Sequence, residues 1–116
     1  MCKLFIAADE ELWKSSTRSL RIDGMVTSVR LESYFWHTLT EIAQRDDLNI
    51  PQLLTKLYHE SIDVGHDLGN FTSFLRVCCM RYLALQLNGS ISTDLSIPLS
   101  SLASDDMLEK EYKHIH

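Results

Sequence analysis

The side chains in this sequence that could carry chemistry are five histidines, three cysteines and a group of arginines. Cys78 and Cys79 are adjacent, and neither has a histidine or cysteine three or four residues away to complete a metal-binding pair on a helix. The histidines have no nucleophile or carboxylate at a recognisable catalytic spacing, and four glycines are too few for a phosphate-binding loop. We therefore expect no metal, no cofactor and no enzymatic activity, and an odd number of cysteines favours buried thiols over disulfides.

The arginines are concentrated in one short segment. The whole chain carries a net charge of −5, which argues against a general polyanion binder. Residues 14–32 nevertheless hold four basic side chains against only two acidic ones, Asp23 and Glu32. A locally basic segment of this kind is typical of a surface that meets nucleic acid.

The same segment has the pattern of a β-hairpin. Two strand-like runs, Arg18–Ile22 and Met25–Leu31, are separated by Asp23-Gly24. Asp-Gly supplies the positive φ angles that a two-residue type I′ turn requires. The predicted register pairs Ile22 with Met25.

This register sorts the side chains of the hairpin into two faces, because successive residues of a strand point to opposite sides. The first face is apolar and consists of Leu20, Ile22, Met25, Thr27, Val29 and Leu31. The second is basic and hydroxyl-bearing and consists of Ser19, Arg21, Val26, Ser28 and Arg30. Arg18 falls on the apolar side and is the exception to the pattern.

Two helices are predicted after the hairpin. Ser33 is expected to cap the first, which should end near Asp46, and Asn49 with Gln52 resembles a capping box for the second, over about Pro51–Asp63. The first should bury Phe35, Trp36, Leu39, Ile42 and Ala43, and the second Leu54, Leu57, Tyr58, Ser61 and Ile62.

A third helix is expected at about residues 71–87, after a loop over Gly65–Gly69. Asn70 or Thr72 should start it, and Asn88-Gly89 is a suitable stop. Its apolar stripe is predicted to contain Phe71, Phe74 or Leu75, Cys78, Tyr82 and Leu85.

The two ends of the chain differ from this middle part. In the N-terminal extension, residues 1–17, we expect a short strand over 3–8, a turn of helix over Asp9–Trp13 and a connector to residue 17. Residues 18–89 form the predicted domain, and 90–116 a loose acidic tail with a short helix at 105–112. Neither a secretory signal nor a membrane span is recognisable, so we expect a cytoplasmic protein.

The middle part resembles a known bacterial family. A strand ending in Val29-Arg-Leu-Glu32, a capped helix and a second helix opened by Asn49 match the element order of ribbon-helix-helix proteins. Three stretches of the sequence are similar to a proteobacterial branch of this family that carries a third helix. They are Thr27-Ser-Val-Arg-Leu-Glu32, Phe35-Trp36 and Asn70-Phe-Thr-Ser-Phe-Leu-Arg76. The resemblance covers about residues 1–90 and implies a mainly α fold with a short β-ribbon, here with an extra N-terminal strand or hairpin.

The resemblance also implies a function. In this family two subunits form an obligate homodimer whose β-ribbon enters the major groove of double-stranded DNA. The base-contacting positions fall on Ser28, Arg30 and Val26. The DNA-backbone positions fall on Arg21 and, at the start of the second helix, on Asn49 and Gln52.

Three functions follow from this resemblance. The first is a transcriptional regulator that reads a specific DNA sequence. The second is a protein-interaction module that kept the dimeric fold and lost DNA binding. The third is an antitoxin, whose tail would bind a protein partner through Leu95, Ile97, Leu99 and Leu102.

Overall fold

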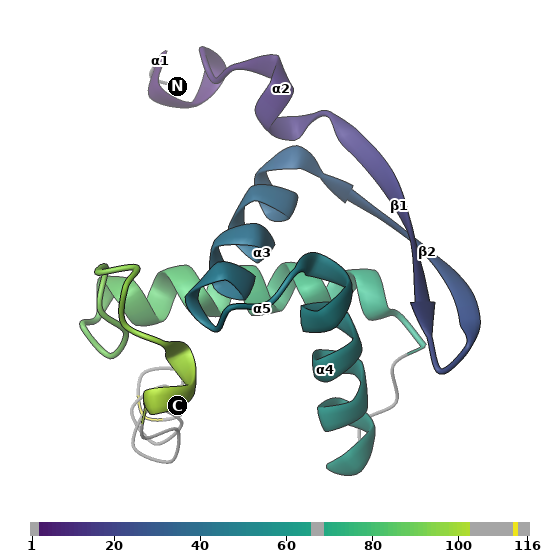
Figure 1. Cartoon of the computed structure of the whole chain (residues 1–116). Helices are drawn as coiled ribbons and strands as arrows, with labels where there is room; N and C mark the ends of the chain where they lie inside the picture. The colour runs from purple at the N-terminus through teal and green to yellow at the C-terminus, as the bar shows by residue number, and fades with distance from the viewer. Residues whose placement is uncertain (1–2, 66–68, 103–112, 114–116) are drawn as a thin grey trace.

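A computed structural model describes residues 3–65, 69–102 and 113 (Figure 1). Its elements are two short N-terminal helices, a two-stranded hairpin, three longer helices and a 3₁₀ turn. In chain order they are α1 (Lys3–Ile6), α2 (Glu10–Trp13), β1 (Ser15–Ile22), β2 (Met25–Glu32), α3 (Ser33–Arg45), α4 (Ile50–Asp63), α5 (Phe71–Leu87) and η1 (Leu99–Ser101). Within the described residues, no helix is long and apolar enough to cross a membrane.

The hairpin has the predicted turn and register. Ile22 is paired with Met25, and the antiparallel ladder continues to Ser15 and Glu32. Asp23 and Gly24 have φ angles of 53° and 79°, as a type I′ turn requires. The ribbon is longer than expected, because residues 15–17, predicted as a connector, belong to β1.

The inner face of the hairpin packs against the helices. Leu20, Ile22, Val29 and Leu31 are buried, whereas Met25, at the turn, is exposed despite its predicted place on the apolar face. Leu20, Val29 and Leu31 belong to one core cluster, to which α3, α4 and α5 contribute Trp36, Leu39, Ala43, Ile50, Leu53, Leu54, Leu75 and Cys79. The hairpin therefore has one face in the core and one in solvent.

The helices begin and end close to their predicted limits. Asn49 accepts from the Gln52 backbone N–H and Gln52 Oε1 accepts from the Asn49 backbone N–H, both at 2.9 Å, which confirms the capping box. Asn70 caps α5 through the Ser73 N–H. Ser33 is not a cap: it is the first residue of α3, and its hydroxyl donates to the Lys14 carbonyl oxygen at 2.9 Å, tying the helix start to the chain before β1.

Two predicted core positions are not fully buried. Ile62 is exposed on α4, whereas its neighbour Ser61, which was also predicted to be in the core, is buried. On α5 the fully buried thiol belongs to Cys79, and Cys78 is only half-buried. Burial raises the pKa of Cys78 to about 11 and that of Cys79 to about 12, in keeping with unreactive thiols.

The N-terminal segment differs from the prediction of a strand. Residues 3–6 form helix α1, and the Ala7 N–H donates to the Lys3 carbonyl oxygen at 3.0 Å. The described sheet has two strands only, so a strand here would lack a partner for its backbone groups. The predicted turn of helix after Asp9 is confirmed as α2, with the Asp9 carboxylate accepting from the Glu11 N–H.

The first part of the C-terminal segment is held against the helices, where a loose tail was expected. Buried Arg45 of α3 donates from Nε to the Ile97 carbonyl oxygen at 3.0 Å and from one terminal nitrogen to the Ser92 carbonyl oxygen at 2.9 Å. The same terminal nitrogen lies 3.2 Å from the Tyr82 hydroxyl, and Ile91 is buried. The helix predicted at 105–112 and most of the loop at 65–69 lie outside the described residues.

Candidate nucleic-acid interface

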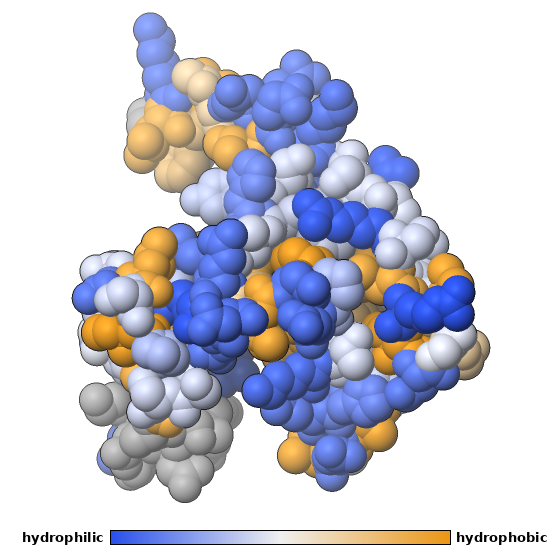
Figure 2. Space-filling model, viewed as in Figure 1, coloured by the Kyte–Doolittle hydropathy of each residue, from blue (hydrophilic) through white to orange (hydrophobic). Residues whose placement is uncertain are grey.

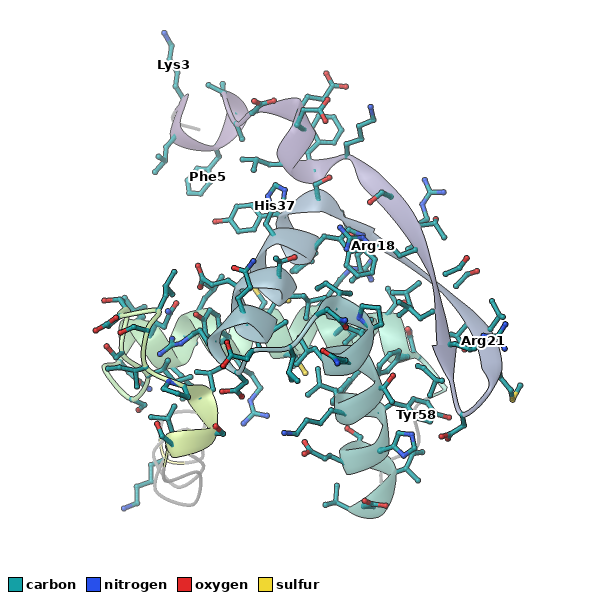
Figure 3. All side chains as sticks on the ribbon, viewed as in Figure 1. Lys3, Phe5, Arg18, Arg21, His37 and Tyr58 are labelled. Atoms are coloured by element: carbon teal, nitrogen blue, oxygen red, sulfur yellow. The ribbon has the colours of Figure 1, made fainter. Side chains whose placement is uncertain are left out.

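The outer face of the hairpin is a continuous polar and basic surface. Alternation along both strands places three cross-strand pairs on it: Thr17 with Arg30, Ser19 with Ser28, and Arg21 with Val26. All six residues are exposed. Figure 3 shows Arg21 directed away from the body near the turn. Guanidinium and hydroxyl groups in this arrangement can donate hydrogen bonds to phosphate oxygens or to base edges.

Arg18, the exception in the sequence pattern, has a structural role on the opposite face. Its guanidinium lies 4.6 Å from the centroid of the Trp36 ring, a cation–π contact with the core of α3. The indole Nε1 of Trp36 donates in turn to the Ser16 carbonyl oxygen at 3.1 Å. Two arginines per chain, Arg21 and Arg30, therefore remain on the outer face.

An ion pair anchors the end of the ribbon to α5. Arg76 donates to both carboxylate oxygens of Glu32, from a terminal nitrogen at 2.7 Å and from Nε at 3.2 Å. These hydrogen bonds lower the pKa of Glu32. The pair also matters for the outer face, because it neutralises the one carboxylate at the base of the strand that carries Arg30.

The other end of the ribbon is held by α4. His59 Nε2 lies 2.9 Å from Asp23 Oδ1 at the turn, and both side chains are largely exposed. The turn and the base of the hairpin are thus each tied to a different helix. Together with the buried inner face, these two contacts orient the outer face of the hairpin.

The start of α4 offers few backbone donors. The Gln52 N–H is used by the capping box, and Pro51 has no N–H. Both side-chain oxygens of the box are also occupied. The amide NH₂ groups of Asn49 and Gln52 are not used by the box, so these side chains and the Ile50 N–H are the groups left to contact a phosphate here.

The structure thus brings four of the six predicted DNA-contacting residues onto one surface. Val26, Ser28, Arg30 and Arg21 lie together on the ribbon, whereas Asn49 and Gln52 belong to the separate start of α4. Thr17 and Ser19 extend the outer face. Ser19 was on the predicted face, but Thr17 was missed because the sequence does not show that β1 begins at residue 15. No group of three metal-ligating side chains occurs among the residues that the structure describes.

A hairpin with one buried and one polar face, followed by a helix and a capped second helix, defines the class of the protein. The chain belongs to the ribbon-helix-helix domain family, because residues 15–83 match the sequence model of that family. Domains of this family generally bind DNA, typically as dimers, and act as transcription regulators or antitoxins. The match includes α5 up to residue 83, beyond the two helices that give the family its name.

A solved structure is similar to this chain over most of its length. It is that of an uncharacterized protein from Bordetella pertussis Tohama I, which is 47% identical and has a TM-score of 0.85. The match covers 89% of this chain and 82% of that one. No curated protein matches the sequence.

Proposed function

We propose that this chain is a DNA-binding transcriptional regulator without catalytic activity, which reads a specific sequence through the outer face of its ribbon. Arg30 and Ser28 would hydrogen-bond to base edges and Val26 would meet a thymine methyl group. Arg21 would contact the phosphate backbone. The observation that supports this proposal is that the outer face from residue 17 to 30 carries two arginines, exposed hydroxyls and no carboxylate, in a chain whose net charge is −5.

The ribbon would act as part of a homodimer. In the described structure each strand is paired on one side only, so β2 has a second edge on which an antiparallel β2 of another copy can pair. Such a pairing gives a four-stranded sheet with β2 in the middle and β1 outside. It places two copies of Val26, Ser28 and Arg30 at its centre.

The two central strands of this sheet fit the major groove, and the outer two extend to its edges. Neighbouring strands lie about 4.8 Å apart, so the two β1 strands would be about 14 Å apart. The major groove is about 12 Å wide, so the two β2 strands would reach its floor and the β1 strands would face its phosphate walls. This division matches the proposed base contacts of Arg30 and the proposed backbone contact of Arg21.

The test is a titration of DNA fragments from the gene's own upstream region at two salt concentrations. Four arginines per dimer on the outer face give an upper limit of about −3.6 for the slope of log affinity against log salt. Arg30→Ala is expected to weaken specific binding by about 1–3 kcal/mol for each copy, or about 5- to 150-fold per copy. Arg21→Ala should weaken all fragments alike and reduce the slope by about 2, one for each copy.

Arg81→Ala is the matched control, because it removes the same charge from an exposed position of α5 outside the ribbon. It should leave both affinity and slope within error of the wild type. Equal losses for Arg81→Ala and Arg30→Ala would mean that binding follows net charge and not the ribbon.

The alternatives give different outcomes. If the wild type binds no fragment at low salt, the protein-interaction module is the better explanation. If it binds its own promoter and a toxin gene adjoins its own, the antitoxin function is favoured. The residues proposed to contact DNA are the same in that case, and the protein partner would bind elsewhere.

A further inference from the structure

An apolar groove runs between α2 and the helical body. It has a volume of about 470 Å³. Leu12 and Trp13 line it from α2, Tyr34 and Phe35 from α3, and Met80 and Leu83 from α5. The groove lies at the Ser15–Glu32 end of the hairpin, opposite the turn, and is separate from the outer face of the ribbon.

Helix α1 lies beside this groove and buries none of its own side chains. Phe5 and Ile6 are 65% and 73% exposed, and neither lines the groove. Figure 2 shows apolar surface on this N-terminal segment, which stands apart from the body, and Figure 3 shows Lys3 pointing away from Phe5. A helix of four residues is not stable alone in water, so α1 needs packing from outside itself.

We propose that the groove is the docking site for α1 of a second copy of this chain, with the two copies exchanging their α1 helices reciprocally. Phe5 and Ile6 of each copy would enter the apolar groove of the other. Arm and groove lie next to each other on the same face, so a two-fold axis brings each arm to the partner's groove. A different protein bound in the groove would leave α1 exposed to solvent. The exchange between two copies covers the groove and α1 together.

The available area is sufficient for a stable contact. The exposed side chains concerned are Phe5 at 65%, Ile6 at 73%, Trp13 at 62%, Tyr34 at 51%, Met80 at 58% and Leu83 at 37%. At about 200 Å² for a large apolar residue, they offer on the order of 700 Å² per copy, close to the roughly 800 Å² per partner of a standard interface. Charge is complementary as well, because α1 carries Lys3 and Glu41 lies in the depression next to the groove.

This interface does not use the edge of β2, so it adds to the proposed ribbon dimer rather than replacing it. Two ribbon dimers joined through exchanged arms form a tetramer. On DNA such an assembly would bind neighbouring sites cooperatively. The arm exchange does not depend on the DNA-binding function, because it involves other residues and can be measured without DNA.

The experiment compares the mass of the full-length protein in solution, by sedimentation velocity over a range of concentrations, for four variants. Phe5→Asp in the arm and Met80→Asp in the groove should each halve the assembly mass of the wild type. Val64→Asp is the matched control, since it places the same charge on an exposed apolar residue at the end of α4, and it should leave the mass unchanged. Phe5→Asp combined with Met80→Lys should restore the wild-type mass, because the two substituted side chains attract each other across the interface.

The outcomes separate this proposal from the ribbon dimer. A fall from tetramer to dimer supports both interfaces, and a fall from dimer to monomer supports the arm exchange alone. If Phe5→Asp lowers the melting temperature without changing the mass, α1 docks within its own chain and the proposal is wrong. It is also wrong if Met80→Asp lowers the mass and Phe5→Asp does not, because another segment then occupies the groove.

Discussion

The ion pair between Glu32 and Arg76 gives the sharpest quantitative test of how the ribbon is positioned. The change is Glu32→Gln, which keeps the size of the side chain and removes its charge. Hydrogen bonds between charged groups contribute about 1.5–3 kcal/mol when shielded, and exposed ion pairs about 0.2–1 kcal/mol. The Arg76 and Glu32 side chains are 40% and 27% exposed, so solvent screening reduces the upper figure. We expect a loss of about 1 kcal/mol at neutral pH, equivalent to roughly 4 °C in melting temperature for a chain of 116 residues.

The pH dependence of this loss distinguishes the ion pair from packing. The pKa of Glu32 is lowered in the folded protein, mainly by the hydrogen bonds from Arg76. Its stabilisation is therefore complete above the pKa of glutamate in the unfolded chain, about 4.3, and disappears as the pH falls through the folded-state pKa. In urea titrations, wild type and Glu32→Gln should differ at neutral pH and converge in acid. A constant difference at all pH values would refute the reasoning.

A double-mutant cycle provides the control for that prediction. Arg76 also lies 6.0 Å from the centroid of the Phe35 ring, so Arg76→Gln loses this contact as well as the pair. Arg76→Gln should therefore cost more than Glu32→Gln. The two substitutions together should cost less than the sum of their separate effects.

Four further predictions concern the core, the 90–102 segment, the turn and the thiols. Leu31→Ala should destabilise the protein by about 2–5 kcal/mol in urea titrations, since the side chain is fully buried where hairpin and helices meet. Arg45→Ala should cost roughly 1–3 kcal/mol, because it leaves the Ile97 and Ser92 carbonyl oxygens without their donor, and proteolysis should then cleave the 90–102 segment faster. Gly24→Ala should lower stability by about 1–2 kcal/mol through its φ of +79° alone, because open space surrounds the position. Cys78 and Cys79 should react with a thiol reagent slowly in the folded protein and rapidly in urea, since burial raises both pKa values.

The parts of the fold that the sequence predicted well are those set by local rules. Asp23-Gly24 permits few turns other than type I′, and alternation then determines the register and both faces of the hairpin. The capping box at Asn49 is likewise a local hydrogen-bond pattern. For this reason the outer face was predicted residue by residue, apart from Thr17.

The parts that failed depend on contacts between distant residues. The apolar run before residue 8 suits a strand or a helix equally, and it is helical because no third strand is available to pair with it in the described sheet. Arg45 looks like an ordinary basic residue at the end of a helix, and its role depends on a carbonyl group 52 positions later. Ser33 has the residue type of a cap, but strand pairing up to Glu32 leaves it inside the helix and directs its hydroxyl to Lys14.

The closure of the ribbon within a single chain affects how the protein responds to dilution. Its strands are joined by two residues and contact α4 and α5 of the same copy, so the contacts that shape the arginine-bearing surface lie within one chain. In the proposed homodimer, folding and assembly would then be separable events. A copy released from the proposed dimer would keep a complete half of the proposed DNA-contacting surface, and occupancy of DNA would fall with concentration while the fold persists.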